Sequence, residues 1–120
     1  MNIRSGRGMV VFLCATYFAV TIGRVVDGDT FDTLIKIYPN QSASVRVRVL
    51  GVDTPEKKGA TMEAAQKATV FTQSWLMAPG EPVTIHACRF DNLSRLLGRV
   101  CRGGTCLDEA LISAGLGVPR

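Results

Sequence analysis

The stretch of sequence with the greatest potential for chemistry is VLGVDTPEKKG, residues 49–59. It leaves an apolar segment and places Asp53 and Glu56 on either side of a Thr-Pro pair. A third acid, Asp29, lies in VDGDT, residues 26–30. Carboxylate oxygens are the hard ligands that suit calcium or magnesium. The two segments are therefore either ordinary strand-ending turns or two halves of one metal site.

Arginines accompany these acids. Arg48 lies five residues before Asp53, and Arg95 precedes another apolar segment. A guanidinium group offers a planar fork that matches two phosphate oxygens. A metal polarises a phosphoryl oxygen, a carboxylate orients water, and arginines stabilise the charge that develops, so the combination favours phosphodiester hydrolysis. Taken singly, Arg46 and Arg48 are typical of a solvated strand face, and Arg95 and Arg99 of surface charges.

The residue pattern before the DTPE segment predicts strands. We expect strands over residues 20–26, 30–37 and 45–52, with a loop over 38–44. Alternation puts Phe31, Thr33, Ile35 and Ile37 on one face, and Val45, Val47 and Val49 on one face of the next strand. In an antiparallel meander, the start of the second strand and the end of the third lie at one end of the sheet. Asp29 and Asp53 should therefore converge.

A helix should follow, because Ala64, Ala68, Phe71 and Trp75 recur at helical spacing. Thr61 can cap its start, and Pro79-Gly80 should end it. Further strands are expected over residues 83–87 and 96–101 with a short return, then a short helix capped by Gly115. The predicted fold class is α+β, mainly β: a five-stranded Greek-key OB-fold barrel with one mid-chain helix and a short C-terminal helix.

Composition and the N-terminal segment set the domain organisation. The 120 residues are 47% hydrophobic and 20% charged, which suits one globular domain and excludes a disordered chain. Two arginines precede an uncharged segment, residues 9–20, that is shorter than the roughly 20 apolar residues of a membrane span. Residues 1–19 are therefore predicted to be a signal peptide, cleaved after Ala15 or Ala19, before a domain at 20–120. The alternatives are an uncleaved membrane anchor and an extended strand.

The signal peptide predicts export to the periplasm or the medium, with no membrane span after processing. The net charge of +4 is a weak indication of an anionic partner such as nucleic acid. Cys101 and Cys106 flank a Gly-Gly turn that would place them opposite each other, so they are expected to form a disulfide, with free thiols as the alternative. Cys14 should leave with the leader, and Cys88 should remain unpaired. A zinc site is less favoured, because His86 is the only histidine.

Four motifs occur in the order of a known family. They are VDGDT at 26–30, RVLGVDTPE at 48–56, DNLSRLLGRV at 91–100 and LDEALISAGLG at 107–117. The chain resembles the thermonuclease family, the staphylococcal (micrococcal) nuclease-like enzymes, over residues 20–117. The RVLGVDTPE motif is the most specific of the four. The family fold is the five-stranded barrel with helices that the strand pattern also predicts.

The resemblance implies a site and a reaction. One calcium ion would be held by Asp29, Asp53 and the backbone carbonyl of Thr54. Catalysis would fall to Arg48, Glu56 and Arg95, with Glu56 orienting or deprotonating water and the arginines binding phosphate. Arg95 is preferred to Arg99 because Asp91 then matches the aspartate of the motif. The implied activity is endonuclease or exonuclease hydrolysis of the 5′ P–O bond in DNA and RNA, single strands favoured, leaving 3′-phosphate ends.

The sequence departs from the family pattern at several points. Leu93 replaces a tyrosine, which predicts weaker substrate binding because one aromatic stack contributes about 1–3 kcal/mol. Ser94 replaces a glycine, and the longer C-terminal helix of the family is not expected before Arg120. These departures favour two alternatives: a non-catalytic module that binds nucleic acid or protein, and a fragment that does not act alone. The oligomeric state stays open.

Overall fold

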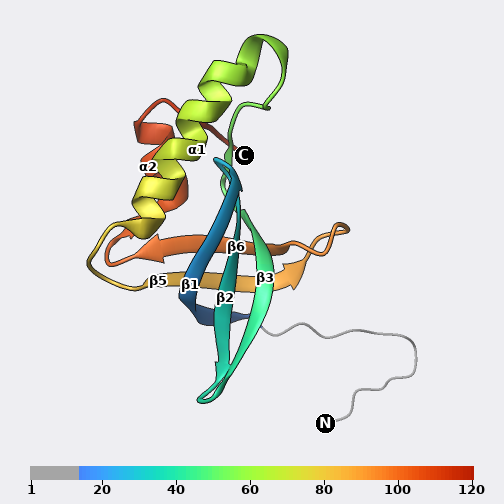
Figure 1. Cartoon of the computed structure of the whole chain (residues 1–120), viewed down its shortest axis with the longest axis vertical. Helices are drawn as coiled ribbons and strands as arrows, with labels where there is room; N and C mark the ends of the chain where they lie inside the picture. Colours follow the sequence, from blue (N-terminus) through green and yellow to red (C-terminus); the bar gives the residue numbers. More distant parts are fainter. Residues whose placement is uncertain (1–13) are drawn as a thin grey trace.

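A long, curved strand opens the described part of the chain, which is residues 14–120 of a computed structural model (Figure 1). The strands are β1 (Ala15–Asp27), β2 (Thr30–Tyr38), β3 (Gln41–Val49), β4 (Val52–Asp53), β5 (Val83–Phe90), β6 (Leu96–Arg102), β7 (Thr105–Cys106) and β8 (Val118–Pro119). The helices are a 3-10 turn (Gly59–Thr61), α1 (Met62–Met77) and α2 (Leu107–Ser113). Both α-helices lie at the same end of the strands and contact each other.

Five of the strands close into a barrel. Their order is β3-β2-β1-β5-β6, and a parallel pairing of β3 with β6 joins the two edges. The predicted mainly-β, five-stranded barrel with two helices is therefore confirmed. Closure removes the free edges that an open sheet of this size would expose.

The core of the barrel follows the predicted alternation. Phe31, Thr33 and Ile35 are buried on β2, and Val47 and Val49 are buried on β3. Ile37 was expected on the same face but is 41% exposed. It lies near the end of the β2–β3 hairpin, beyond the residues that the barrel encloses.

The predicted loop over residues 38–44 is wrong. Only Pro39 and Asn40 form the turn, and Gln41 already pairs with Tyr38 at the start of β3. Ser42 and Ser44 belong to the ladder with β2, and both side chains are exposed. The polar composition of this segment reflects the solvent exposure of the hairpin. Residues 41–44 nevertheless form a strand, because their backbone pairs with β2.

Helix α1 ends before Pro79-Gly80, as predicted, and packs against β1. Its buried positions are Ala65, Ala68, Thr72 and Leu76. Phe71 and Trp75 are partly buried against the core, whereas Ala64 is exposed. Ala64 was expected to begin the apolar face of the helix, but the buried face begins one residue later, at Ala65.

The hairpin of β6 and β7 places Cys101 opposite Cys106, and the two form the expected disulfide. A second disulfide joins Cys14 to Cys88, so the expectation that Cys88 stays unpaired is wrong. The register explains this pairing: Ala15 lies opposite Ala87, which puts Cys14 and Cys88 opposite each other at the adjoining position.

The leader prediction falls largely on residues outside the described part of the chain, which begins at residue 14. Residues 15–19 belong to β1 and pair with β2 or β5, as the extended-strand alternative has it. Cleavage of residues 1–19 stays a prediction. No helix within residues 14–120 has the length and apolar character to cross a membrane.

Candidate functional site

The site is built on a tight turn between β1 and β2. A Cβ atom on Gly28 would lie 2.7 Å from Thr54 Cγ2 and 2.8 Å from Ala68 Cβ. Only glycine therefore allows α1 and the DTPE segment to approach the turn this closely. The buried Thr72 hydroxyl of α1 donates a 2.6 Å hydrogen bond to the Gly28 carbonyl, which fixes the turn against the helix.

The turn delivers Asp29 to the end of β3. Thr30 pairs with Arg48, and the Val49 amide donates to the Asp29 carbonyl at 2.8 Å. The side chain of Arg48 is only 9% exposed, and its Nη2 lies 3.5 Å from Asp29 Oδ2 and bonds Asp53 Oδ1. The two aspartates, 24 residues apart in sequence, thus meet at one guanidinium group.

A sharp bend after β3 brings Asp53 to this meeting point. Gly51 has a φ of 91°, and a Cβ there would lie 2.6 Å from Asp108 Oδ2. Beyond the bend, the Thr54 amide donates a 3.0 Å hydrogen bond to Asp29 Oδ2. Arg48 Nη1 holds the bend by donating to the carbonyls of Val49 and Val52 at 2.6 and 3.0 Å.

A basic groove of about 620 Å³ opens beside the acids. The charged side chains of its walls are Arg48, Arg89, Arg95, Arg120 and Asp91. Arg120 also bonds Asp53 Oδ1 at 3.0 Å, so the acid pair and the groove share both Arg48 and Arg120. Four arginines line one hollow, and such positive charge is suited to a phosphodiester anion.

Asp91 orients Arg95 toward this groove. Asp91 Oδ1 accepts hydrogen bonds from the amides of Leu93 and Arg95, each at 2.9 Å, and Oδ2 accepts from Arg95 Nε at 2.7 Å. Desolvation opposes ionisation of Asp91, but these bonds outweigh it and hold its pKa below the ordinary value. The predicted alternative Arg99 instead pairs with Glu109 and Asp108 of α2, outside the groove.

Ser94, in the loop that carries Arg95, has a φ of 62° and is the one non-glycine residue within 14–120 with positive φ. The left-handed conformation costs a residue with a Cβ atom about 1–2 kcal/mol, a cost that glycine avoids. Glycine in turn lowers stability by about 0.4–1 kcal/mol, because it increases the conformational entropy of the unfolded chain. We expect Ser94→Gly to stabilise the fold by about 0.5–1 kcal/mol in urea unfolding. Asn92→Gly, at a negative φ in the same loop, serves as the control and should not stabilise.

Glu56 lies apart from the groove. Its side chain is 74% exposed and pairs with Lys58 Nζ at 3.2 Å. No hydrogen bond or ion pair joins its carboxylate to Asp29, Arg48 or Arg95 in the part of the chain that the structure covers. The structure thus brings together Asp29, Asp53, Arg48 and the Thr54 backbone, and places Arg95 in the lining of the groove that Arg48 also lines, while Glu56 points to solvent.

A third carboxylate, Asp27, adjoins the acid pair and was not singled out from the sequence. Burial, together with a hydrogen bond and repulsion from Asp29, raises the pKa of Asp27 to about 6. Burial also opposes ionisation of Asp29, but bonds from Asp27 and Thr54 and the charge of Arg48 hold the pKa of Asp29 below its ordinary value. The VDGDT motif therefore contains one acid whose pKa is raised, mainly by burial, and one whose pKa is lowered by its partners.

Asp27→Asn tests the cost of ionising Asp27 in the folded chain. Because the pKa of Asp27 is higher in the folded chain than in the unfolded chain, its ionisation lowers stability as pH rises from about 4 to about 6. The isosteric amide should therefore stabilise the chelator-treated protein at pH 7.5 by about 1 kcal/mol, after allowance for solvent screening, and less at pH 4.

Thermal unfolding across this pH range measures the effect. Asp32→Asn is the control with opposite sign, because Arg46 lowers the pKa of Asp32. A gain from Asp27→Asn that is the same at every pH would show that charge is not its cause.

Arg89 and Arg120 were also missed by the sequence analysis. The strand predicted over residues 83–87 does not reach Arg89. In the structure β5 continues to Phe90, and Arg89 lines the groove. Arg120 reaches Asp53 through the pairing of β4 with β8, two strands of two residues each. Strands that short leave no periodic pattern, so the sequence held no usable signal for Arg120.

Comparisons with known proteins found one family model and two curated relatives that match the chain. The family model described as staphylococcal nuclease homologue matches residues 46–119. Two curated relatives, from Escherichia coli O157:H7 and Escherichia coli, are each described as an uncharacterized endonuclease. Each is 29% identical over 104 residues, which is 86% of this chain and 61% of the relative. The chain thus spans less than two thirds of the length of these relatives.

Proposed function

The chain belongs to the family of staphylococcal nuclease homologues, and from this premise we propose that it is a calcium-dependent nuclease of single-stranded DNA and RNA. In this proposal it is an exported enzyme that hydrolyses the 5′ P–O bond and leaves 3′-phosphate ends. The printed description of the Escherichia coli relatives as endonucleases supports the coarser reaction class.

One observation carries the proposal: an arginine-lined groove lies directly beside a pair of aspartates that share Arg48. A phosphodiester in the groove would meet arginines from two neighbouring strands, Arg48 on β3 and Arg95 directly before β6. Such preorganised donors stabilise the charge that builds on phosphate oxygens in the transition state.

The residues present fit a hard divalent cation. The carboxylates of Asp29 and Asp53 converge on one nitrogen of Arg48, and the Asp27 carboxylate adjoins them by accepting a hydrogen bond from the Asp29 amide. Calcium takes six to eight oxygen ligands, so carbonyl groups and water must complete the set. Asp29, Asp53 and the Thr54 carbonyl would hold the ion, which supplies polarisation of the phosphoryl oxygen.

The roles of the protein side chains follow from their positions. Arg95, fixed by Asp91, binds and orients the phosphate, and so does Arg48, whose guanidinium group also pairs with both aspartates. Glu56 is on an exposed segment that also bears Lys58, so it must leave its ion pair to orient water at the phosphate. Leu93, 72% exposed at the groove, offers bases an apolar contact without a hydroxyl.

Cleavage assays test the proposal. Purified protein should degrade single-stranded DNA and RNA with calcium, stop with chelator, and leave 3′-phosphate ends that resist ligation. Glu56→Gln should lower kcat by about 10²–10⁴ without changing the melting temperature. Glu63→Gln, an exposed acid on α1 paired with Lys67, is the matched control and should cleave normally. Undiminished cleavage by Glu56→Gln would refute the role of Glu56, and cleavage in chelator would refute calcium dependence.

A second candidate is a non-catalytic module that binds nucleic acid. The orientation of Glu56 toward Lys58 and the ion pair of Arg120 with Asp53 favour it. It predicts salt-sensitive binding of single-stranded DNA without cleavage, with or without calcium. Binding and cleavage measured on the same oligonucleotide distinguish the two candidates.

A further inference from the structure

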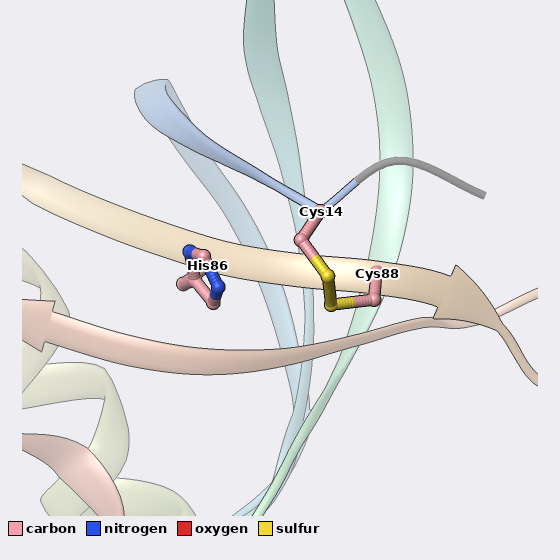
Figure 2. A group of neighbouring side chains, drawn as sticks. All are labelled: Cys14, His86 and Cys88. Carbon is pink, nitrogen blue, oxygen red and sulfur yellow. A yellow bond between two sulfur atoms is a disulfide. The ribbon is translucent and has the colours of Figure 1, made fainter.

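A cluster of side chains of metal-ligating types, Cys14, His86 and Cys88, lies along β5 (Figure 2). The ligand atoms of Cys14, His86 and Cys88 all lie within 4.8 Å of one another, and they are the one such group of three among residues 14–120. The cysteine sulfurs are joined as a disulfide, and His86 is beside them on the same strand as Cys88. None of the three lines the basic groove.

The strand register explains the cluster. His86 and Cys88 are two residues apart on β5, so their side chains point to the same face. Thr16 lies opposite His86, and the same register places Cys14 opposite Cys88. Ile85 and Ala87 point the other way and are buried in the barrel, which leaves the cluster accessible to solvent. The barrel thus holds two cysteine sulfurs and an imidazole together by strand pairing.

From this arrangement we infer that Cys14, Cys88 and His86 form a redox-gated zinc site in the chain that still carries residues 1–19. A cellular thiol breaks the disulfide in two exchange steps: the reductant becomes its own disulfide, and each cysteine sulfur gains a proton. Zn²⁺ then binds two thiolates and the imidazole, and two protons are released. The oxidised chain has no thiolates to offer, so the disulfide and the zinc complex exclude each other.

Distances and side-chain contacts support zinc at this position. Tetrahedral zinc with Zn–S of about 2.3 Å and Zn–N of about 2.0–2.1 Å keeps its ligands roughly 3.5–3.8 Å apart, which small rotamer changes can reach here. Thr16 Oγ1 lies 2.9 Å from His86 Nδ1 and can accept a hydrogen bond from the Nδ1–H group, which leaves Nε2 free for the metal. Three protein ligands leave the fourth position open to water.

Cobalt and zinc titrations of the full chain test the inference. The background is Cys101→Ser with Cys106→Ser, which removes the other two thiols. After reduction by a phosphine without oxygen, Co²⁺ should give a thiolate-to-cobalt charge-transfer band that saturates at one ion per chain and disappears with Zn²⁺. The oxidised chain should give no band.

Single variants assign the ligands. Cys14→Ser and Cys88→Ser should each lower zinc affinity at least 100-fold, His86→Ala at least tenfold, and Thr16→Val about tenfold because it only orients the imidazole. Circular dichroism follows the fold of the reduced, metal-free chain. A missing band, an equal band from Cys14→Ser, or unfolding that zinc does not reverse would each overturn the site. None of these results depends on whether the chain cleaves nucleic acid.

Discussion

Arg48→Met should destabilise the fold by about 3–5 kcal/mol at neutral pH, because it leaves a buried carboxylate without its counter-charge. Arg48 is the contact that Asp29 and Asp53 share, and it also donates to two backbone carbonyls of the bend after β3. Methionine replaces the aliphatic part of the side chain, so lost packing contributes little. Urea unfolding in chelator measures the change.

Two comparisons separate charge from general damage. Arg46→Met, two residues earlier on β3 and paired with Asp32 at the surface, should cost much less. The charge contribution of Arg48 depends on an ionised Asp29, whose pKa is below its ordinary value in the folded chain. It is therefore present at neutral pH and lost as pH falls through the folded pKa, so the penalty should shrink in acid. A loss of stability in Arg48→Met that is the same at neutral pH and in acid would contradict this explanation.

Arg95→Lys should lower kcat about 10²–10³-fold while the melting temperature stays nearly unchanged. The ammonium group keeps the positive charge but loses the planar fork that Asp91 orients toward the groove. Steady-state cleavage of a short single-stranded oligonucleotide with calcium gives kcat and KM separately. A rise in KM alone would indicate that Arg95 binds substrate without stabilising the transition state.

Arg99→Lys is the matched control for Arg95→Lys. Arg99 lies four residues further along and pairs with Glu109 and Asp108 of α2, outside the groove. The Arg99→Lys variant should cleave the oligonucleotide at the same rate as the unmodified chain. Loss of activity in Arg99→Lys with normal activity in Arg95→Lys would reverse the assignment of the motif arginine.

The barrel was predictable because burial on one face leaves a period of two in the sequence. Phe31, Thr33 and Ile35 show this clearly, and the fixed spacing from Arg48 to Asp53 places an acid just past the end of a strand. The site geometry around Asp29 then follows from the meander. Where strands extend past the core, as at Ser42, both faces are exposed and no alternation of apolar and polar residues marks the strand. The predicted loop over residues 38–44 was wrong for this reason.

Other features depend on information that no local pattern carries. The Cys14–Cys88 bridge follows from the register between β1 and β5, which lie far apart in the chain. The contact of Arg120 with Asp53 rests on two minimal strands. The orientation of Glu56 is a rotamer choice on an exposed segment beside Lys58. Motif spacing therefore indicates which residues are near the site. Whether a given side chain faces the site depends on its other available partners, as Lys58 is for Glu56.

The Cys14–Cys88 bridge also changes what cutting the N-terminal segment would achieve. A peptidase acting after Ala15 or Ala19 on the folded chain would sever the backbone but leave the preceding peptide fastened to β5 through sulfur. Release of that peptide would then wait for a reductant, whereas cutting before the bridge forms would free it at once. The order in which cutting and oxidation occur therefore decides whether one polypeptide or two covalently joined pieces result.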